Sequence, residues 1–179
     1  LGASILHDVD ATNIRGSMAG QLVRDASSPP AIYDRIVWNF PCVARGLGAG
    51  MDGQNDEMED NKTLVRCFAD NTPPFLSSAG EVILTHKTKP PYNHWSLVEQ
   101  VTQSGRLAYA GAVIFDRVCY PPYVNRKALD KKSFPCFDAQ MYIFTAANNA
   151  ATAAVHHALD KSDKETETEK EVAVDLPVE

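Results

Sequence analysis

Two runs of nearly uninterrupted apolar residues constrain the fold of this chain more than any other feature. They cover residues 35–40 (RIVWNF) and residues 81–87 (EVILTHK). Strands that are covered on both faces read as continuous apolar runs, and such strands are typical of parallel sheets. Residues 61–76 lie between the runs and have helical spacing of apolar side chains in their first three turns. The order strand, helix, strand predicts a parallel pair joined by a right-handed crossover.

The remaining segments extend this pattern in both directions. We predict strands at residues 4–10, 107–115 and 139–145, and a helix at residues 95–104. Glycine-rich residues 45–60 are expected to be a loop, residues 77–80 a turn, and residues 116–138 an irregular segment. The last two strands follow each other without a helix, which predicts an antiparallel pair at one sheet edge. The arrangement resembles the back half of an α/β, Rossmann-like class I methyltransferase sheet, mostly parallel, with its N-terminal strands missing.

Composition divides the 179 residues into a body and a tail. Residues 160–179 contain eight acidic residues and three lysines, which gives them a net charge of -5 out of the -6 of the whole chain. The body is therefore close to neutral. The charge therefore gives no indication of nucleic-acid binding. We expect a partial methyltransferase domain at residues 1–146, an alanine-rich helix at 147–160 and an acidic disordered tail at 161–179. The chain starts with Leu1 almost directly on a strand, which predicts a fragment that lacks its N-terminal part.

Cysteine spacing and hydropathy bear on the cellular compartment. The four cysteines are far apart, without the spacing of a zinc site, and we interpret them as reduced thiols of an intracellular protein. No signal segment or apolar run of membrane length is present in the sequence. We therefore expect no membrane and no metal among the partners.

The first apolar run ends on Asn39, Phe40 and Pro41. In a parallel sheet this places Asn39 at a carboxyl end, where such sheets bind ligands. An amide can both donate to and accept from a planar base, and the neighbouring aromatic ring can stack on one. We expect Asn39 to project from an inner strand into an open crevice beside Asp10, which ends the first predicted strand. A structural turn is the alternative for Asn39, Phe40 and Pro41.

Similarity to one family extends over residues 1–145. The chain resembles the ribosomal RNA uridine-N3 methyltransferases of the large-subunit type, in order and spacing across about four-fifths of its length. The matching stretches are LGA (1–3), VDAT (9–12), YDRIVWNFP (33–41), Asn61 with LVRCF (64–68), GEV (80–82), THKT (85–88), PY (91–92), Trp95, YPPY (120–123), Arg126, FP (134–135) and YIF (142–144). The chain departs from the family in reading Cys42 where a histidine is usual and in lacking the Gly-x-Gly-Asp-x-Ser cofactor loop.

The resemblance implies S-adenosyl-L-methionine as cofactor and methylation of uridine N3 in large-subunit ribosomal RNA or a pre-ribosome. Asn39, Phe40, Pro41 and Lys87 would be catalytic, and Asp10 and Asn39 would contact the cofactor. A cation such as Lys87 favours loss of the N3 proton. A turn acid is the alternative for Asp10, and a surface lysine for Lys87. This fragment alone is expected to be inactive.

Aromatic residues interleaved with basic ones suit single-stranded RNA. We predict that Tyr92, Tyr120, Tyr123 and Arg126 contact RNA, with a merely solvated basic loop as the alternative. Trp95 is expected to be a core anchor, His86 a satisfied strand-end residue and Cys42 a small apolar filler.

The sequence leaves alternatives for both the cellular location and the function of the protein. We expect the nucleolus or nucleus, with the cytoplasm as an alternative. The alternative function is a non-catalytic RNA-binding or ribosome-assembly module that kept the fold but lost the cofactor loop. A dinucleotide-dependent reductase would instead need a Tyr/Lys pair that we do not find.

Overall fold

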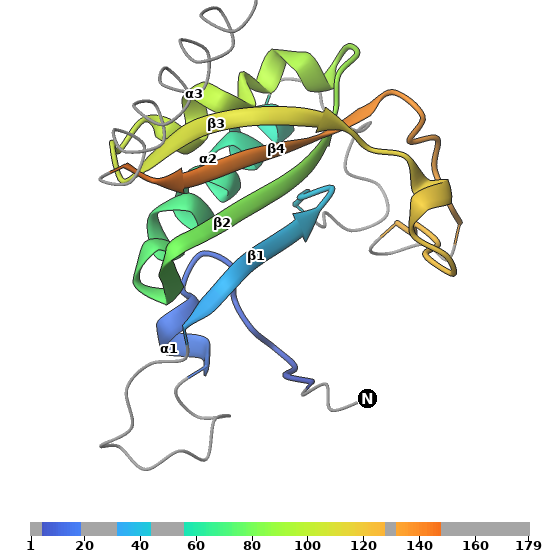
Figure 1. Cartoon of the computed structure of the whole chain (residues 1–179). Helices are drawn as coiled ribbons and strands as arrows, with labels where there is room; N and C mark the ends of the chain where they lie inside the picture. Colours follow the sequence, from blue (N-terminus) through green and yellow to red (C-terminus); the bar gives the residue numbers. More distant parts are fainter. Residues whose placement is uncertain (1–4, 19–31, 44–55, 128–131, 148–179) are drawn as a thin grey trace, which may run out of the picture.

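Four strands form one mixed sheet in the computed structural model of the chain, which describes residues 5–18, 32–43, 56–127 and 132–147 (Figure 1). The strands are β1 (Tyr33–Asn39), β2 (Leu76–Lys87), β3 (Leu107–Ile114) and β4 (Ala139–Ala146), in the spatial order β1-β2-β4-β3. β1 pairs with β2 in parallel, whereas β4 is antiparallel to both β2 and β3. β1, β2 and β3 therefore point the same way, and their carboxyl ends lie at one end of the sheet.

Two helices cover one face of this sheet (Figure 1). α2 (Asp56–Asn71) connects β1 to β2, and α3 (Leu97–Thr102) lies between β2 and β3. The shorter elements are α1 (Ile14–Met18) and the 3₁₀ turns η1 (Pro73–Phe75), η2 (Tyr92–Trp95) and η3 (Arg117–Cys119). α3 ends at Thr102, and the turn that follows it contains Gly105, whose φ of 69° is a conformation that glycine adopts without steric cost.

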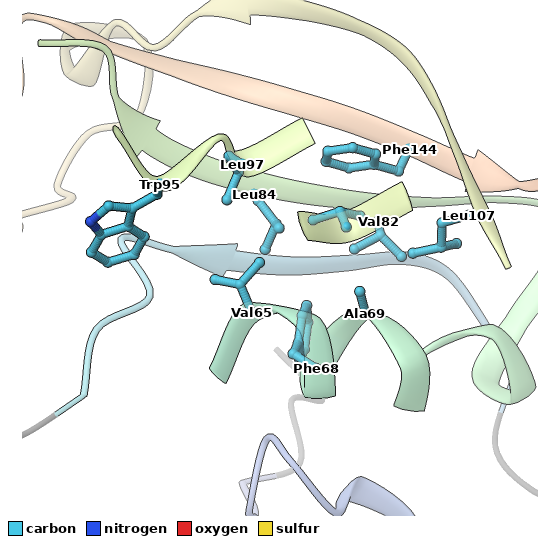
Figure 2. Packing of buried hydrophobic residues seen from close by; sticks show 10 residues of the cluster. Val65, Phe68, Ala69, Val82, Leu84, Trp95, Leu97, Leu107 and Phe144 are labelled. Atoms are coloured by element: carbon cyan, nitrogen blue, oxygen red, sulfur yellow. The ribbon is translucent and has the colours of Figure 1, made fainter. Parts of the chain in front are cut away.

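The core lies between the sheet and these helices (Figure 2). Side chains from α2 point at strand residues that alternate along β2 and β4. The buried cluster consists of Val65, Phe68, Ala69, Val82, Leu84, Trp95, Leu97, Val101, Leu107 and Phe144. Since alternate residues of a strand face opposite sides, Ile83 and Thr85 lie on the face away from the helices. Their partners on β1 are Val37 and Asn39.

The structure confirms the α/β fold. It also confirms the predicted strands at residues 35–40, 81–87, 107–115 and 139–145, and the two predicted helices that cover the sheet. The prediction of a mostly parallel sheet is wrong for the described strands, because β1–β2 is their only parallel pairing. β3 and β4 do form the expected antiparallel pair, but β4 lies inside the sheet, between β2 and β3. β1 is an edge strand of the described sheet and not the inner strand we expected.

Three local predictions also differ from the structure. Residues 5–10 are not a strand, since none of the described strands offers them a backbone partner. Residues 56–60 belong to α2 and not to the preceding loop. Residues 77–80 belong to β2, where they form an irregularity between the pairs Tyr33–Leu76 and Arg35–Glu81.

Gly80 shows why this irregularity needs a glycine. A Cβ at Gly80 would approach the backbone nitrogen and oxygen of Ser77 to 3.0 Å.

The predicted loop at 45–55, the alanine-rich helix beyond Ala147 and the acidic tail lie outside the described residues. No helix within the described ranges is long and apolar enough to cross a membrane.

Candidate functional site

Asn39 lies at the carboxyl end of β1 with its side chain exposed. Its Oδ1 accepts a hydrogen bond of 2.7 Å from the hydroxyl of Thr85, its neighbour in the β1–β2 register. Thr85 is fully buried, and its backbone carbonyl accepts a 2.9 Å hydrogen bond from the amide of Phe40. The last residue of β1 and the first residue after it are therefore both fixed by one residue of β2.

Phe40 turns the chain across the end of the sheet. Its φ is 54°, a conformation that bulky residues rarely adopt and that is often found at functional sites. The Phe40 ring makes edge contacts with Phe115, at a centroid distance of 5.6 Å, and with Phe134, at 5.0 Å. Pro41, which follows, is buried. The turn formed by Asn39, Phe40 and Pro41, called the Asn39 turn below, thus packs the end of β1 against the segment that follows β3.

A second apolar cluster holds that segment against the strand ends. Its buried members are Phe115, Cys136 and Ala139, and the residues packed on them are Phe40, Tyr123, Phe134 and Met141. Tyr120 stacks on Phe115 at 5.7 Å. Burial raises the pKa of Tyr123, as does the neighbouring Cys136, whereas a hydrogen bond with the Asn39 side chain lowers it. Tyr123 therefore lies near Asn39. The two residues belong to separate sequence motifs, and neither motif by itself indicated that they would be neighbours.

Asn125 closes this segment into a compact loop. Its side chain is buried; Nδ2 donates to the Phe134 carbonyl at 2.5 Å, and Oδ1 accepts from Arg117 at 3.4 Å. Tyr120 and Arg126, predicted to bind RNA, are exposed on the same loop, and Tyr123 is half-buried. The structure therefore groups three of the four predicted RNA contacts, while their role stays a prediction.

Lys87 and Tyr92 lie together at the carboxyl end of β2. The Lys87 ammonium is 4.5 Å from the centre of the Tyr92 ring, in a cation–π contact. His86 is buried and its Nε2 lies 3.1 Å from the Tyr92 carbonyl, so the ring donates through Nε2, since a carbonyl only accepts. The pKa of His86 is lowered to about 4, mainly by burial; the hydrogen bond to the Tyr92 carbonyl opposes this lowering, and the charge of Lys87 adds to it. His86 is therefore a neutral, satisfied strand-end residue, as predicted.

Trp95 is a core anchor, as predicted, with 2% of its surface exposed. Its ring lies 4.5 Å from that of His86. Figure 2 shows the indole nitrogen directed away from the other labelled core residues, and this buried donor has no hydrogen-bond partner within the described ranges.

Asp10 lies elsewhere. Its Oδ1 accepts from the amide and hydroxyl of Thr12, at 2.8 and 2.7 Å, and these bonds lower the pKa of Asp10. The Thr12 carbonyl accepts from Asn71, the last residue of α2, which lies just before β2 begins. Asp10 is thus a turn acid near the amino end of β2, away from Asn39, and the structure does not bring the two together. Its cofactor role stays a prediction.

Two further predictions can be compared with the structure. Cys42 is exposed and is not the apolar filler we expected; the buried cysteine of the site is Cys136. None of the four cysteines forms a disulfide. In the described part of the chain, no group of histidine, cysteine and acidic residues could hold a metal ion.

Sequence reasoning missed Thr85 and Asn61 as site-forming residues. Asn61 is buried in α2, accepts from the Val43 amide at 2.7 Å and donates to the Glu57 carbonyl at 2.8 Å, so it fixes the segment after Pro41. Both residues occur in the stretches that carry the family resemblance, which was the available signal. Their partners follow from strand register and helix position, which the sequence does not display.

The fold and the site define an α/β protein whose polar and aromatic residues gather at the carboxyl ends of its strands. Comparison with known families makes this specific: residues 1–127 match the family described as rRNA (uridine-N3-)-methyltransferase BTM5-like, and the chain belongs to this family. The match includes Asn39, Thr85, Lys87 and Tyr123.

Two proteins of Arabidopsis thaliana are similar to the chain. "Uncharacterized protein At4g26485" is 28% identical over 148 residues, which are 80% of this chain and 66% of that protein. "Heavy metal-associated isoprenylated plant protein 41" is 30% identical over 130 residues, which are 71% of this chain and 22% of that protein. The chain thus spans about two thirds of the first protein's length and about a fifth of the second's.

Proposed function

We propose that the whole protein methylates N3 of a uridine in large-subunit ribosomal RNA. The observation that carries this proposal is the family match over residues 1–127, which includes the Asn39 turn. The position of β4, antiparallel between β2 and β3, supports a class I methyltransferase type of sheet. The exposed Asn39 and the neighbouring aromatic loop support a base-binding role for the carboxyl ends of the strands.

The residues at these strand ends would bind and orient the uridine. Asn39 would contact the base, while Phe40 and Pro41 would shape the turn that presents it. Tyr92, Tyr120, Tyr123 and Arg126 would contact the RNA around the target. Lys87 would favour the ionised form of the base, since a nearby cation lowers the cost of losing the N3 proton.

S-adenosyl-L-methionine would supply the methyl group in the whole protein. The described residues do not by themselves fit this cofactor, because Asp10 and Asn39 lie apart and Asp10 is engaged in its own turn. The large subunit as the source of the RNA, a pre-ribosome as partner and a nucleolar, nuclear or cytoplasmic location belong to the same proposal.

The separation of Asp10 from Asn39 favours a second candidate, a non-catalytic RNA-binding or ribosome-assembly module. Such a module would keep the aromatic loop and need no cofactor site.

Mass spectrometry of ribosomal RNA nucleosides distinguishes the two candidates. Cells without the full-length gene should lack N3-methyluridine in large-subunit RNA, and the wild-type gene should restore it. Asn39→Ala should fail to restore it while remaining folded. Gln103→Ala, an exposed amide at the end of α3, serves as the matched control and should restore it. Unchanged N3-methyluridine without the gene, together with accumulating ribosome precursors, would favour the assembly module.

A further inference from the structure

Phe137 is an aromatic residue that the fold leaves on the surface. Its side chain is 82% exposed. It lies in the turn that enters β4, at the end of the sheet where the carboxyl ends of β2 and β3 are found (Figure 1). Cys136 before it and Ala139 two residues after it are buried in the second apolar cluster. Because these two residues already attach the backbone to the protein, the ring of Phe137 is not needed for packing.

Lys89 lies beside Phe137, just beyond the last paired residues of β2 and β4. The carbonyl oxygen of Asp138 accepts two hydrogen bonds of 2.8 Å, one from the amide and one from the hydroxyl of Thr88. Lys89 is the next residue along the chain from Thr88, and it is exposed. Phe137 is the residue before Asp138, so this double hydrogen bond makes Phe137 and Lys89 neighbours.

The backbone is fixed on both sides of this pair. The Lys89 carbonyl oxygen accepts from the amides of Tyr92, at 3.0 Å, and Asn93, at 3.4 Å, so the turn η2 holds Lys89. Asp138, the acidic residue that adjoins Phe137, turns its Oδ1 into the protein, where this atom is buried. A ligand at the pair therefore meets an ordered backbone, and its binding has to order only the two side chains.

An exposed aromatic ring beside a cation suits a nucleotide of a single strand. The ring offers its face to a base, and the ammonium group binds phosphate as a point charge. A protein partner that covered the ring with apolar residues would also have to remove the Lys89 ammonium from water, which is costly. The chemistry of the pair therefore favours RNA over an apolar protein surface.

We propose that Phe137 and Lys89 form a flanking nucleotide site, in which Phe137 stacks on a base and Lys89 binds a neighbouring backbone phosphate. Thr85, the partner of Asn39, is four residues before Lys89, which corresponds to roughly 13 Å of extended chain. The base on Phe137 is therefore a neighbour of the target nucleotide and not the target itself. The inference rests on the proposed function for RNA as the partner. Phe137 lies outside residues 1–127, so the family match does not imply this site.

Equilibrium binding of a labelled oligouridylate of about ten nucleotides to the 179-residue chain tests the stacking. Phe137→Leu should weaken binding roughly five- to a hundredfold, the range for one lost base stack. Phe137→Tyr should bind like wild type. Tyr33→Leu, at an exposed position of β1, is the matched control and should also bind like wild type. Since Phe137 is exposed, its variants should keep the circular dichroism spectrum of the wild type.

The two substitutions of Phe137 separate base stacking from an apolar docking surface. Leucine keeps an apolar side chain without a ring, whereas tyrosine keeps the ring. Phe137→Trp adds a fluorophore, and RNA should quench its emission beyond the change seen in the wild type. Wild-type affinity in Phe137→Leu would overturn the stacking. Loss of self-association in that variant with unchanged RNA binding would also overturn it and would assign the ring to an interface between copies of the chain.

Ionic strength tests the phosphate contact of Lys89. Lys89→Gln should reduce the slope of log K against log salt concentration by about 0.7, the value for one phosphate on a single strand. Phe137→Leu removes no charge and should keep the wild-type slope. Arg15→Gln, which removes a charge from α1, is the control and should keep it too. An unchanged slope in Lys89→Gln would refute the phosphate contact.

Methylation by the full-length protein separates this inference from the proposed function. Phe137→Leu should raise KM for RNA and leave kcat nearly unchanged, because the site lies beside the target nucleotide. The expected binding defects in a protein that leaves ribosomal RNA unmethylated would support the flanking site and reject the proposed function. Methylation of uridine N3 with wild-type RNA binding in both Phe137→Leu and Lys89→Gln would reject the flanking site alone.

Discussion

Phe40 is the residue where backbone strain and the candidate site coincide. Its φ of 54° is one of three positive values at non-glycine residues in the described chain, and it follows Asn39 directly. A left-handed conformation costs a residue with a side chain about 1–2 kcal/mol, which glycine does not incur. The contacts of the ring with Phe115 and Phe134 offset that cost.

Substitution of Phe40 should reverse the usual ranking of alanine and glycine. Both Phe40→Ala and Phe40→Gly lose the ring contacts, so both should be less stable than wild type. Only Phe40→Gly also relieves the backbone, so it should exceed Phe40→Ala in free energy of unfolding by about 1 kcal/mol. Urea denaturation of the two variants measures the difference.

Phe115 offers the matched control, because it contacts Phe40 and its backbone φ is not positive. There the alanine variant should be the more stable one, by about 0.5–1 kcal/mol. The same order at both positions would show that the Phe40 turn stores no strain.

At the scale of elements, His86 joins the end of β2 to the turn η2. The neutral ring donates to the Tyr92 carbonyl at 3.1 Å and packs against Trp95. Burial lowers the pKa of His86 from 6.5 to about 4. The unfolded chain therefore binds a proton between pH 6.5 and 4 that the folded chain does not bind, and stability falls as the pH falls through this window.

The contact between β2 and η2 should accordingly be sensitive to acid. Between pH 7 and pH 4 the titration of His86 should remove up to about 3 kcal/mol from the free energy of unfolding. His86→Gln keeps a donor for the Tyr92 carbonyl but does not titrate, so its stability should depend less on pH in this range. Urea denaturation at pH 7, 6, 5 and 4 checks this. The control His94→Gln, at an exposed position in η2, should retain the wild-type slope, and a wild-type slope in His86→Gln would refute the assignment.

Elements with their own apolar pattern could be predicted from the sequence, and those that depend on a partner could not. The apolar runs identified β1 and most of β2, and helical spacing identified α2 from residue 61 onward. The start of α2 was missed because glycines up to Gly53 suggested a loop, although acidic residues from Asp56 onward favour a helix N-terminus. Residues 5–10 have an apolar pattern too, but a strand also needs a neighbour for its backbone bonds.

The residues of the candidate site divide in the same way, into those that a local sequence pattern indicates and those that depend on a partner elsewhere in the fold. The position of Asn39 at the carboxyl end of a strand could be predicted, and its contact with a ligand stays a prediction. Thr85 became visible only with the β1–β2 register, and Tyr123 only with the loop that packs on Phe40. The predicted position of Asp10 beside Asn39 was wrong because the strand that was expected to end at Asp10 is absent from the described sheet.

At the scale of the whole molecule, the described residues group the candidate base-binding residues but leave Asp10 apart from them. The residues that we propose to bind the base lie at the carboxyl ends of the strands, whereas Asp10 is held at the amino end of β2 through Thr12 and Asn71. Because these two groups of residues lie apart, we predict that uridine binding and cofactor binding are separable properties of the 179-residue chain.

Isothermal titration of the 179-residue chain with S-adenosyl-L-methionine should show weak binding or none, while the same preparation binds oligouridylate. Asp10→Asn should leave both results unchanged, because the Asp10 carboxylate bonds Thr12 and lies apart from Asn39. The full-length protein is the positive control and should bind the cofactor. Micromolar affinity in the chain itself would contradict the separation, and its loss in Asp10→Asn would restore Asp10 to the cofactor site. The same substitution in the full-length protein, which should bind the cofactor, decides which role Asp10 has: a turn acid predicts unchanged affinity in Asp10→Asn, and a cofactor ligand predicts its loss.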